Sequence, residues 1–155
     1  MIVRKLMVVL LASSAVFAAA ACDDDEGPTV ERFSATLTGA SEVPPVTTTA
    51  TGSAVVEFTA TGLTYTVNVT GIQNVTLAHI HGPAAPGVNA GVILNLNPNL
   101  TVTTGLLASG TATTTNAAAI SMDSLKALIR NGNAYVNVHN TANPGGHIRG
   151  QLVRL

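Results

Sequence analysis

The sequence predicts a mainly β protein, built as an antiparallel β-sandwich with one short cross-over helix. Threonine and valine are frequent after residue 33, and β-branched side chains favour strands. Apolar and polar residues alternate in several short runs, which is the period of a half-buried strand. Glycine, proline and asparagine separate these runs, as they do in antiparallel sandwiches and barrels. The 155-residue chain is 46% hydrophobic, so it can build a substantial core.

The clearest strand pair is a hairpin of residues 52–60 and 63–70. Alternation is strict in the second run, whose inward side chains are Leu63, Tyr65, Val67 and Val69. The first run places Ala54, Val56 and Phe58 on one face. The link at residues 60–62 is short and ends in glycine, which favours a tight turn between antiparallel strands.

The other predicted strands are short and spread over the rest of the chain. They are residues 33–37, 76–81, 90–96, 110–115, 134–139 and 147–154.

One segment, residues 121–130, has a helical pattern instead. Ser121 can cap its start, and Asp123 lies in the first turn, where the helix dipole favours negative charge. Leucine and isoleucine recur at helical spacing, and Asn131-Gly132 ends the segment. We expect this cross-over helix to pack on one edge of the sandwich.

The N-terminus has the pattern of a secretory signal peptide, residues 1–21: two basic residues, an apolar run and small residues before a cleavage site. Ala19-Ala20-Ala21-Cys22 resembles the lipobox of bacterial lipoproteins, although its first position is usually leucine. The resemblance implies that Cys22 is lipidated and anchors the chain to a membrane; the alternative is ordinary cleavage that leaves a free thiol. Residues 22–32, which include four consecutive acidic residues, are interpreted as a solvated tether to a domain at 33–155. Nothing in the sequence distinguishes the inner from the outer membrane.

Composition excludes several functions. Only 10% of residues are charged and the net charge is −1, so the chain has no basic surface for nucleic acid. A single cysteine allows neither an intrachain disulfide nor a cysteine-based zinc site. The body has three side-chain carboxylates, Glu42, Glu57 and Asp123, and none of the common catalytic motifs. We therefore expect no enzymatic activity, unless histidines hold a redox metal.

Four segments of the body resemble the CHRD domain, a module first described in chordin and widespread in bacterial secreted proteins. They are FSATLTGASEVPP at 33–45, AHIHGPA at 78–84, YVNVHN at 135–140 and GGHIRGQL at 145–152, in the family's order. The resemblance implies a β-sandwich of immunoglobulin-like or superoxide-dismutase-like shape, and it implies little about function. His147 stands where the family usually has glutamate, which leaves the role of that position open.

Three histidines are candidate metal ligands. His79 and His81 are two residues apart and share one face of their strand, and His139 shares a face with Tyr135 and Asn137. If the intervening valines and isoleucine face the core, these histidines face outward or into a cleft. Imidazole suits zinc or copper, provided that the nitrogens come within about 4 Å of one another. Two alternatives are a hydrogen-bonded structural network and a surface for a partner.

Glu42 and Arg149 are candidates for a buried structural ion pair, because charges in the body are scarce. Taken together, the sequence predicts a membrane-anchored, extracytoplasmic, non-catalytic binding or structural module of the cell envelope, with an unknown envelope or extracellular protein partner. The alternative is a copper or zinc protein that uses His79, His81 and His139, with superoxide-dismutase-like activity as a less favoured extension.

Overall fold

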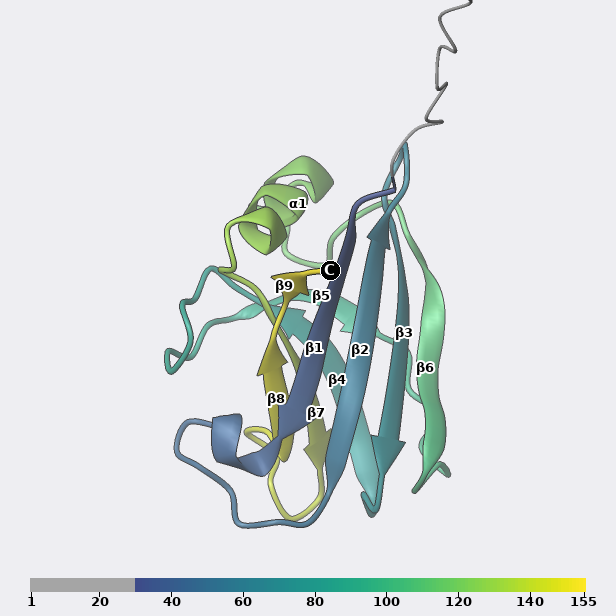
Figure 1. Ribbon diagram of the computed structural model, residues 1–155, viewed down its shortest axis with the longest axis vertical. Helices are drawn as coiled ribbons and strands as arrows, with labels where there is room; N and C mark the ends of the chain where they lie inside the picture. Colours follow the sequence, from purple (N-terminus) through teal and green to yellow (C-terminus); the bar gives the residue numbers. More distant parts are fainter. Residues whose placement is uncertain (1–29) are drawn as a thin grey trace, which may run out of the picture.

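The computed structural model describes residues 30–155, so the predicted signal peptide, Cys22 and most of the tether lie outside the described residues. Figure 1 shows strands that wrap around a common interior, with one helix at one end. The strands are β1 Arg32–Thr38, β2 Thr51–Phe58, β3 Leu63–Thr70, β4 Val75–His81, β5 Val92–Leu96, β6 Gly105–Ala112, β7 Tyr135–Asn140, β8 Ile148–Gln151 and β9 Val153–Arg154. A short 3-10 helix at Gly39–Ser41 follows β1, and helix α1, Met122–Arg130, connects β6 to β7.

All pairings in the described sheet are antiparallel, in the order β5-β4-β7-β8-β1-β2-β3-β6, with β9 paired to β1. The sheet bends until its two edge strands approach each other, and β5 contacts β6. The N–H of Asn116 donates to the carbonyl of Ile93 across this seam, at 2.8 Å. The predicted antiparallel β-sandwich with one helix is therefore confirmed, in a form that is nearly a closed barrel.

The interior is filled by the apolar side of the alternating strands. β2 and β3 pair from Thr51↔Thr70 to Phe58↔Leu63, which confirms the predicted hairpin. The side chains predicted to face inward on both strands are all buried. Removing such side chains from water is the main favourable contribution to folding.

The prediction of a strand at 110–115 was displaced, because β6 spans Gly105–Ala112. Its first six residues read GLLASG, in which Leu107 and Ala108 are consecutive and both buried. The pairing with β3 shifts register beside Val67 and Asn68, and this irregularity interrupts the alternation that strand prediction relies on. The predicted strand 147–154 is likewise divided into β8 and β9, which end and begin on either side of Leu152.

Helix α1 begins and ends as its sequence predicts. The hydroxyl of Ser121 accepts a hydrogen bond from the N–H of Ser124 at 3.1 Å, and Gly132 follows the helix with a φ of 69°. Leu125 and Ile129 are buried in the core. Arg130 contacts the carboxylate of Glu31 and stacks on the ring of Phe58, 4.9 Å from its centroid. In residues 30–155, no helix has the length and hydropathy needed to span a membrane.

Candidate functional site

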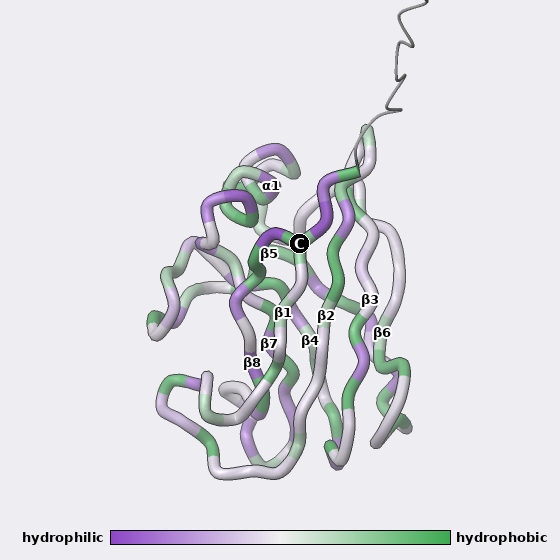
Figure 2. Tube along the Cα trace, viewed as in Figure 1, coloured by the Kyte–Doolittle hydropathy of each residue, from purple (hydrophilic) through white to green (hydrophobic). Residues whose placement is uncertain are grey.

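Three neighbouring strands, β4, β7 and β8, carry polar side chains on the face opposite the core. Figure 2 shows hydrophilic residues along these strands, and in the register His79 lies opposite Asn137, His81 opposite Tyr135, and Asn137 opposite Arg149. The alternate residues on the same strands belong to the core: Ala78, Ile80, Val136, Val138 and Ile148. The strand period therefore gathers several polar side chains on one side of the sheet. We call this set the polar face: His79, His81, Tyr135, Asn137, His139 and Arg149.

The polar face is buried, although it lies outside the core. His79, His81 and His139 are 8%, 7% and 5% exposed, and Arg149 is 2% exposed. Two loops contact it, because the carbonyl of Ala90 is 3.0 Å from Nδ1 of His81 and the carbonyl of Pro144 is 3.0 Å from Nδ1 of His139. The histidines thus face away from the core, as predicted, but under loops instead of solvent.

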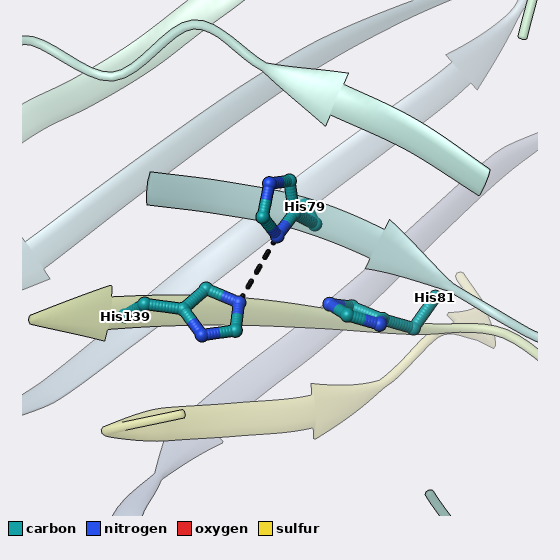
Figure 3. Close-up of side chains that lie close together, drawn as sticks. All are labelled: His79, His81 and His139. Carbon is teal, nitrogen blue, oxygen red and sulfur yellow. Dashed lines mark hydrogen bonds between the residues drawn. The ribbon is translucent and has the colours of Figure 1, made fainter. Parts of the chain in front are cut away.

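The three histidines form a compact cluster (Figure 3). Nδ1 of His79 is 3.0 Å from Nε2 of His139, a hydrogen bond that joins β4 to β7. The ring centroids are 4.9 to 5.7 Å apart. One nitrogen from each residue can be chosen so that all three lie within 4.8 Å of one another. The three candidate ligands therefore lie together, although the 4.8 Å separation is larger than the about 4 Å that a shared ion requires.

The hydrogen bonds define which nitrogens carry protons when the rings are neutral. A backbone carbonyl can only accept, so Nδ1 donates in both His81 and His139. Nε2 of His139 then holds a lone pair and accepts from Nδ1 of His79. Nε2 of His81 also holds a lone pair, and it is buried without a hydrogen-bond partner. Such an unpaired buried nitrogen is costly unless something binds it.

Burial keeps the cluster neutral. Burial, together with the positive charges that His139 and His81 would carry, lowers the pKa of His79 to about 4. Burial also lowers the pKa values of His81 and His139, against the opposing effect of their carbonyl partners. Neutral imidazole is the form that binds metals.

The cluster fits a metal ion after a small adjustment. Two nitrogens that bind one ion at about 2 Å are at most about 4 Å apart, so the 4.8 Å separation must shorten by about 1 Å. The hydrogen bond between His79 and His139 would open, because a lone pair that binds the ion cannot also accept a hydrogen bond. The carbonyls at Ala90 and Pro144 already provide the hydrogen bonds that usually orient metal-binding imidazoles.

A stack of planar groups supports one side of the cluster. The rings of His81 and Tyr135 are parallel to within 4°, with centroids 5.0 Å apart. The guanidinium carbon of Arg149 lies 3.5 Å from the centroid of Tyr135. Arg149 donates to the side-chain oxygen of Asn89 at 2.9 Å and to the carbonyl of Val88 at 2.8 Å. The ring of Tyr135 therefore lies between the positively charged guanidinium of Arg149 and the ring of His81.

Glu42 and Arg149 do not form the predicted contact ion pair among the described residues. The guanidinium uses Asn89 and Val88 as acceptors instead, and Oε1 of Glu42 has no partner. Burial raises the pKa of Glu42 to about 7, while the charge of Arg149 and a hydrogen bond from Asn137 act in the opposite direction. Both residues line a cavity of about 400 Å³ together with Gln151.

His147 lies outside the cluster. Its ring nitrogens are 3.1 Å from the hydroxyl of Thr48 and 2.9 Å from Nδ2 of Asn143. Burial lowers its pKa. These contacts connect the loop after the 3-10 helix to the turn before β8, which indicates a structural role.

Sequence reasoning missed the residues that cover the polar face. Asn89, the carbonyls of Val88 and Ala90, and Gly146 come from loops without a strand or helix pattern. Gly146 has a φ of 143°, and a Cβ there would lie 2.6 and 2.7 Å from the two carboxylate oxygens of Glu42. The Gly145-Gly146 pair is the one available signal in these loops, because paired glycines are typical of a tight turn.

Comparison with known proteins supports the resemblance noted in the sequence. A model of the CHRD domain family matches residues 33–152, which include every strand from β2 to β8 and all four histidines. No curated protein and no solved structure matches the chain significantly.

Proposed function

Because the chain belongs to the CHRD domain family, we propose that it is a non-catalytic binding module of the cell envelope whose ligand is a copper or zinc ion. The cluster of His79, His81 and His139 would hold the ion. The family match supports a binding or structural module, and the cluster supplies the chemistry that a metal needs.

One observation carries the proposal: Nε2 of His81 is buried and has no partner, in a cluster of three neutral imidazoles. A purely structural network would be expected to satisfy this nitrogen, as it satisfies the two Nδ1 donors. A metal ion would satisfy it and would also use the lone pairs of the neighbouring rings.

Metal content tests the proposal directly. Untagged protein is incubated separately with copper and zinc, dialysed, and analysed for bound metal. We expect one ion per chain, and less than one tenth of that in His81→Ala. His147→Ala is the matched control, because it removes a buried imidazole outside the cluster and should retain the ion. Absence of bound metal from the wild-type protein would refute the proposal.

A structural network is the second candidate function of the cluster. The 3.0 Å hydrogen bond between His79 and His139 favours it, because this bond joins two strands without any ion. On this alternative, His79→Ala lowers the free energy of unfolding in the presence of a chelator, and added metal does not stabilise the wild-type protein. A metal-binding site predicts stabilisation by added ion, because the folded state alone holds the ligands together.

We also propose that Cys22 anchors the module to a bacterial membrane on the extracytoplasmic side. The lipobox-like sequence that ends in Cys22 supports the proposal. An anchor at Cys22 would place the acidic tether between the membrane and the domain. Labelling of growing cells with a tagged fatty acid should mark the wild-type protein but not Cys22→Ala. Equal labelling of both proteins would exclude lipidation at Cys22.

The non-catalytic role rests on the side chains that the body offers. Glu57 is half-exposed and contacts Arg32 at 2.6 Å, and Asp123 lies in the first turn of α1. Neither carboxylate belongs to the polar face. The remaining catalytic route is dismutation of superoxide by a copper ion bound to the histidines. An assay on copper-loaded protein tests it, and we expect no activity above that of the metal-free protein.

A further inference from the structure

We infer that the cluster of His79, His81 and His139 selects monovalent copper, Cu(I), over divalent zinc, because its ligands are neutral and buried and Arg149 adds a fixed positive charge nearby. This inference rests on the proposed function and names the ion that the site prefers. Imidazole is a ligand for both metals, so the donor atoms alone do not decide between them. The charge of the site does.

The ligand set carries no negative charge. In residues 30–155, the group of side chains close enough to share an ion contains three histidines and no carboxylate or thiolate. Zinc bound to imidazoles alone keeps its full double charge, unless a hydroxide takes an open position. Cu(I) bound to the same three rings leaves a single charge.

Burial penalises the double charge more strongly. Each of the three imidazoles is less than one tenth exposed, and the carbonyls of two loops close on the cluster. The cost of taking an ion out of water rises with the square of its charge, so a divalent ion costs about four times as much as a monovalent ion of the same size. A hydroxide that offsets the charge of zinc needs access to solvent, which this burial restricts.

Arg149 acts in the same direction. Its guanidinium carbon is 3.5 Å from the Tyr135 centroid, which is 5.0 Å from the His81 centroid, so the charge lies within about 8.5 Å of the His81 ring. The side chain is 2% exposed, and its two described hydrogen-bond acceptors are neutral amide oxygens. Below the pKa of Glu42, about 7, that neighbouring carboxyl is protonated and does not offset the charge of Arg149. At an effective dielectric constant of about 20, this charge then weakens binding of a second unit of positive charge by more than about tenfold.

Competition experiments test the selectivity. Reduced protein under anoxic conditions is titrated with Cu(I) against a chromophoric Cu(I) chelator, and separately with zinc against a chromophoric zinc chelator. We expect the wild-type dissociation constant for Cu(I) to be at least 100-fold below that for zinc. Equal affinity for the two ions would overturn the inference and leave the proposed function intact, whereas binding of neither ion would refute both.

Two variants test the role of the charge. Arg149→Met removes the charge and keeps an unbranched apolar stem, and it should reduce the ratio of the two affinities by about tenfold, mainly by tightening zinc. Arg149→Lys keeps the charge and should retain the ratio. An unchanged ratio in a folded Arg149→Met protein would show that this charge does not select the ion. If the Arg149→Met protein does not fold, the wild-type ratio still decides the inference.

Discussion

Replacing Glu42 with glutamine isolates the cost of burying an ionised carboxylate. Glu42 is 5% exposed, and Oε1 has no hydrogen-bond partner. The groups that act on it are the charge of Arg149 and the amide of Asn137, and both favour ionisation, but burial outweighs them. Glutamine has a similar shape and no charge, so the comparison removes the titration while it retains most of the packing.

The magnitude follows from the pKa of Glu42, which rises from 4.5 to about 7 on folding. Below pH 4.5 the carboxyl is protonated in both states and has no linked effect. Between pH 4.5 and about 7 the unfolded chain releases the proton and the folded protein keeps it, so stability falls as pH rises. Above pH 7 the loss is complete and amounts to about 3 kcal/mol, at about 1.4 kcal/mol for each unit of pKa.

The assay is urea denaturation of the wild-type protein and Glu42→Gln at pH 4.5 and at pH 8, with a chelator present to remove metal. We expect Glu42→Gln to gain about 3 kcal/mol relative to the wild type when the pH is raised from 4.5 to 8. Other titrating groups affect both proteins and cancel in this difference. The same difference in free energy at both pH values would refute the reasoning, because it would mean that Glu42 has an ordinary pKa in the folded protein.

In the Glu42→Gln background, stability should fall as pH decreases from 6.5 to about 4. In this range His79 takes up a proton in the unfolded chain but stays neutral in the folded protein, where its pKa is about 4. His79→Gln should remove about 3 kcal/mol of this loss in urea denaturation, and an unchanged pH dependence would contradict the prediction. Gly146→Ala should cost about 1–3 kcal/mol in thermal unfolding because of its positive φ and its close approach to Glu42. Gly145→Ala is the matched control, since a Cβ there meets nothing within 4 Å; equal effects would exclude this cause. Ser121→Ala should cost about 1 kcal/mol in urea denaturation by loss of the helix cap, and a change near zero would show that the cap does not stabilise the helix.

The strands of the hairpin and the helix could be predicted because their signals are local. Alternation in residues 63–70 requires only that one face of β3 meets a core. Ser121 and Gly132 act within one turn of the helix that they bound. β6 could not be placed in this way, because its buried pair Leu107 and Ala108 depends on a register shift in the pairing of β6 with β3.

The candidate site could also be predicted only where the signal is local. The i, i+2 spacing puts His79 and His81 on one face, and the same parity puts Tyr135 and Asn137 beside His139. The sequence does not show that β4 and β7 are neighbours, because 60 residues separate His79 from His139. Pairing between distant strands depends on the register of the whole sheet, which no local pattern encodes.

The sequence by itself therefore determined the fold class, the faces of the strands, and the residue types available for chemistry. Only the tertiary structure decided that the polar face is buried, because loops at residues 82–91 and 141–147 cover it. It also decided that Arg149 stacks on Tyr135 instead of contacting Glu42. Burial and electrostatic interactions act through space, so they depend on which segments contact one another and not on the sequence within each segment. In this protein, those two quantities set the ion that the histidine cluster is proposed to prefer.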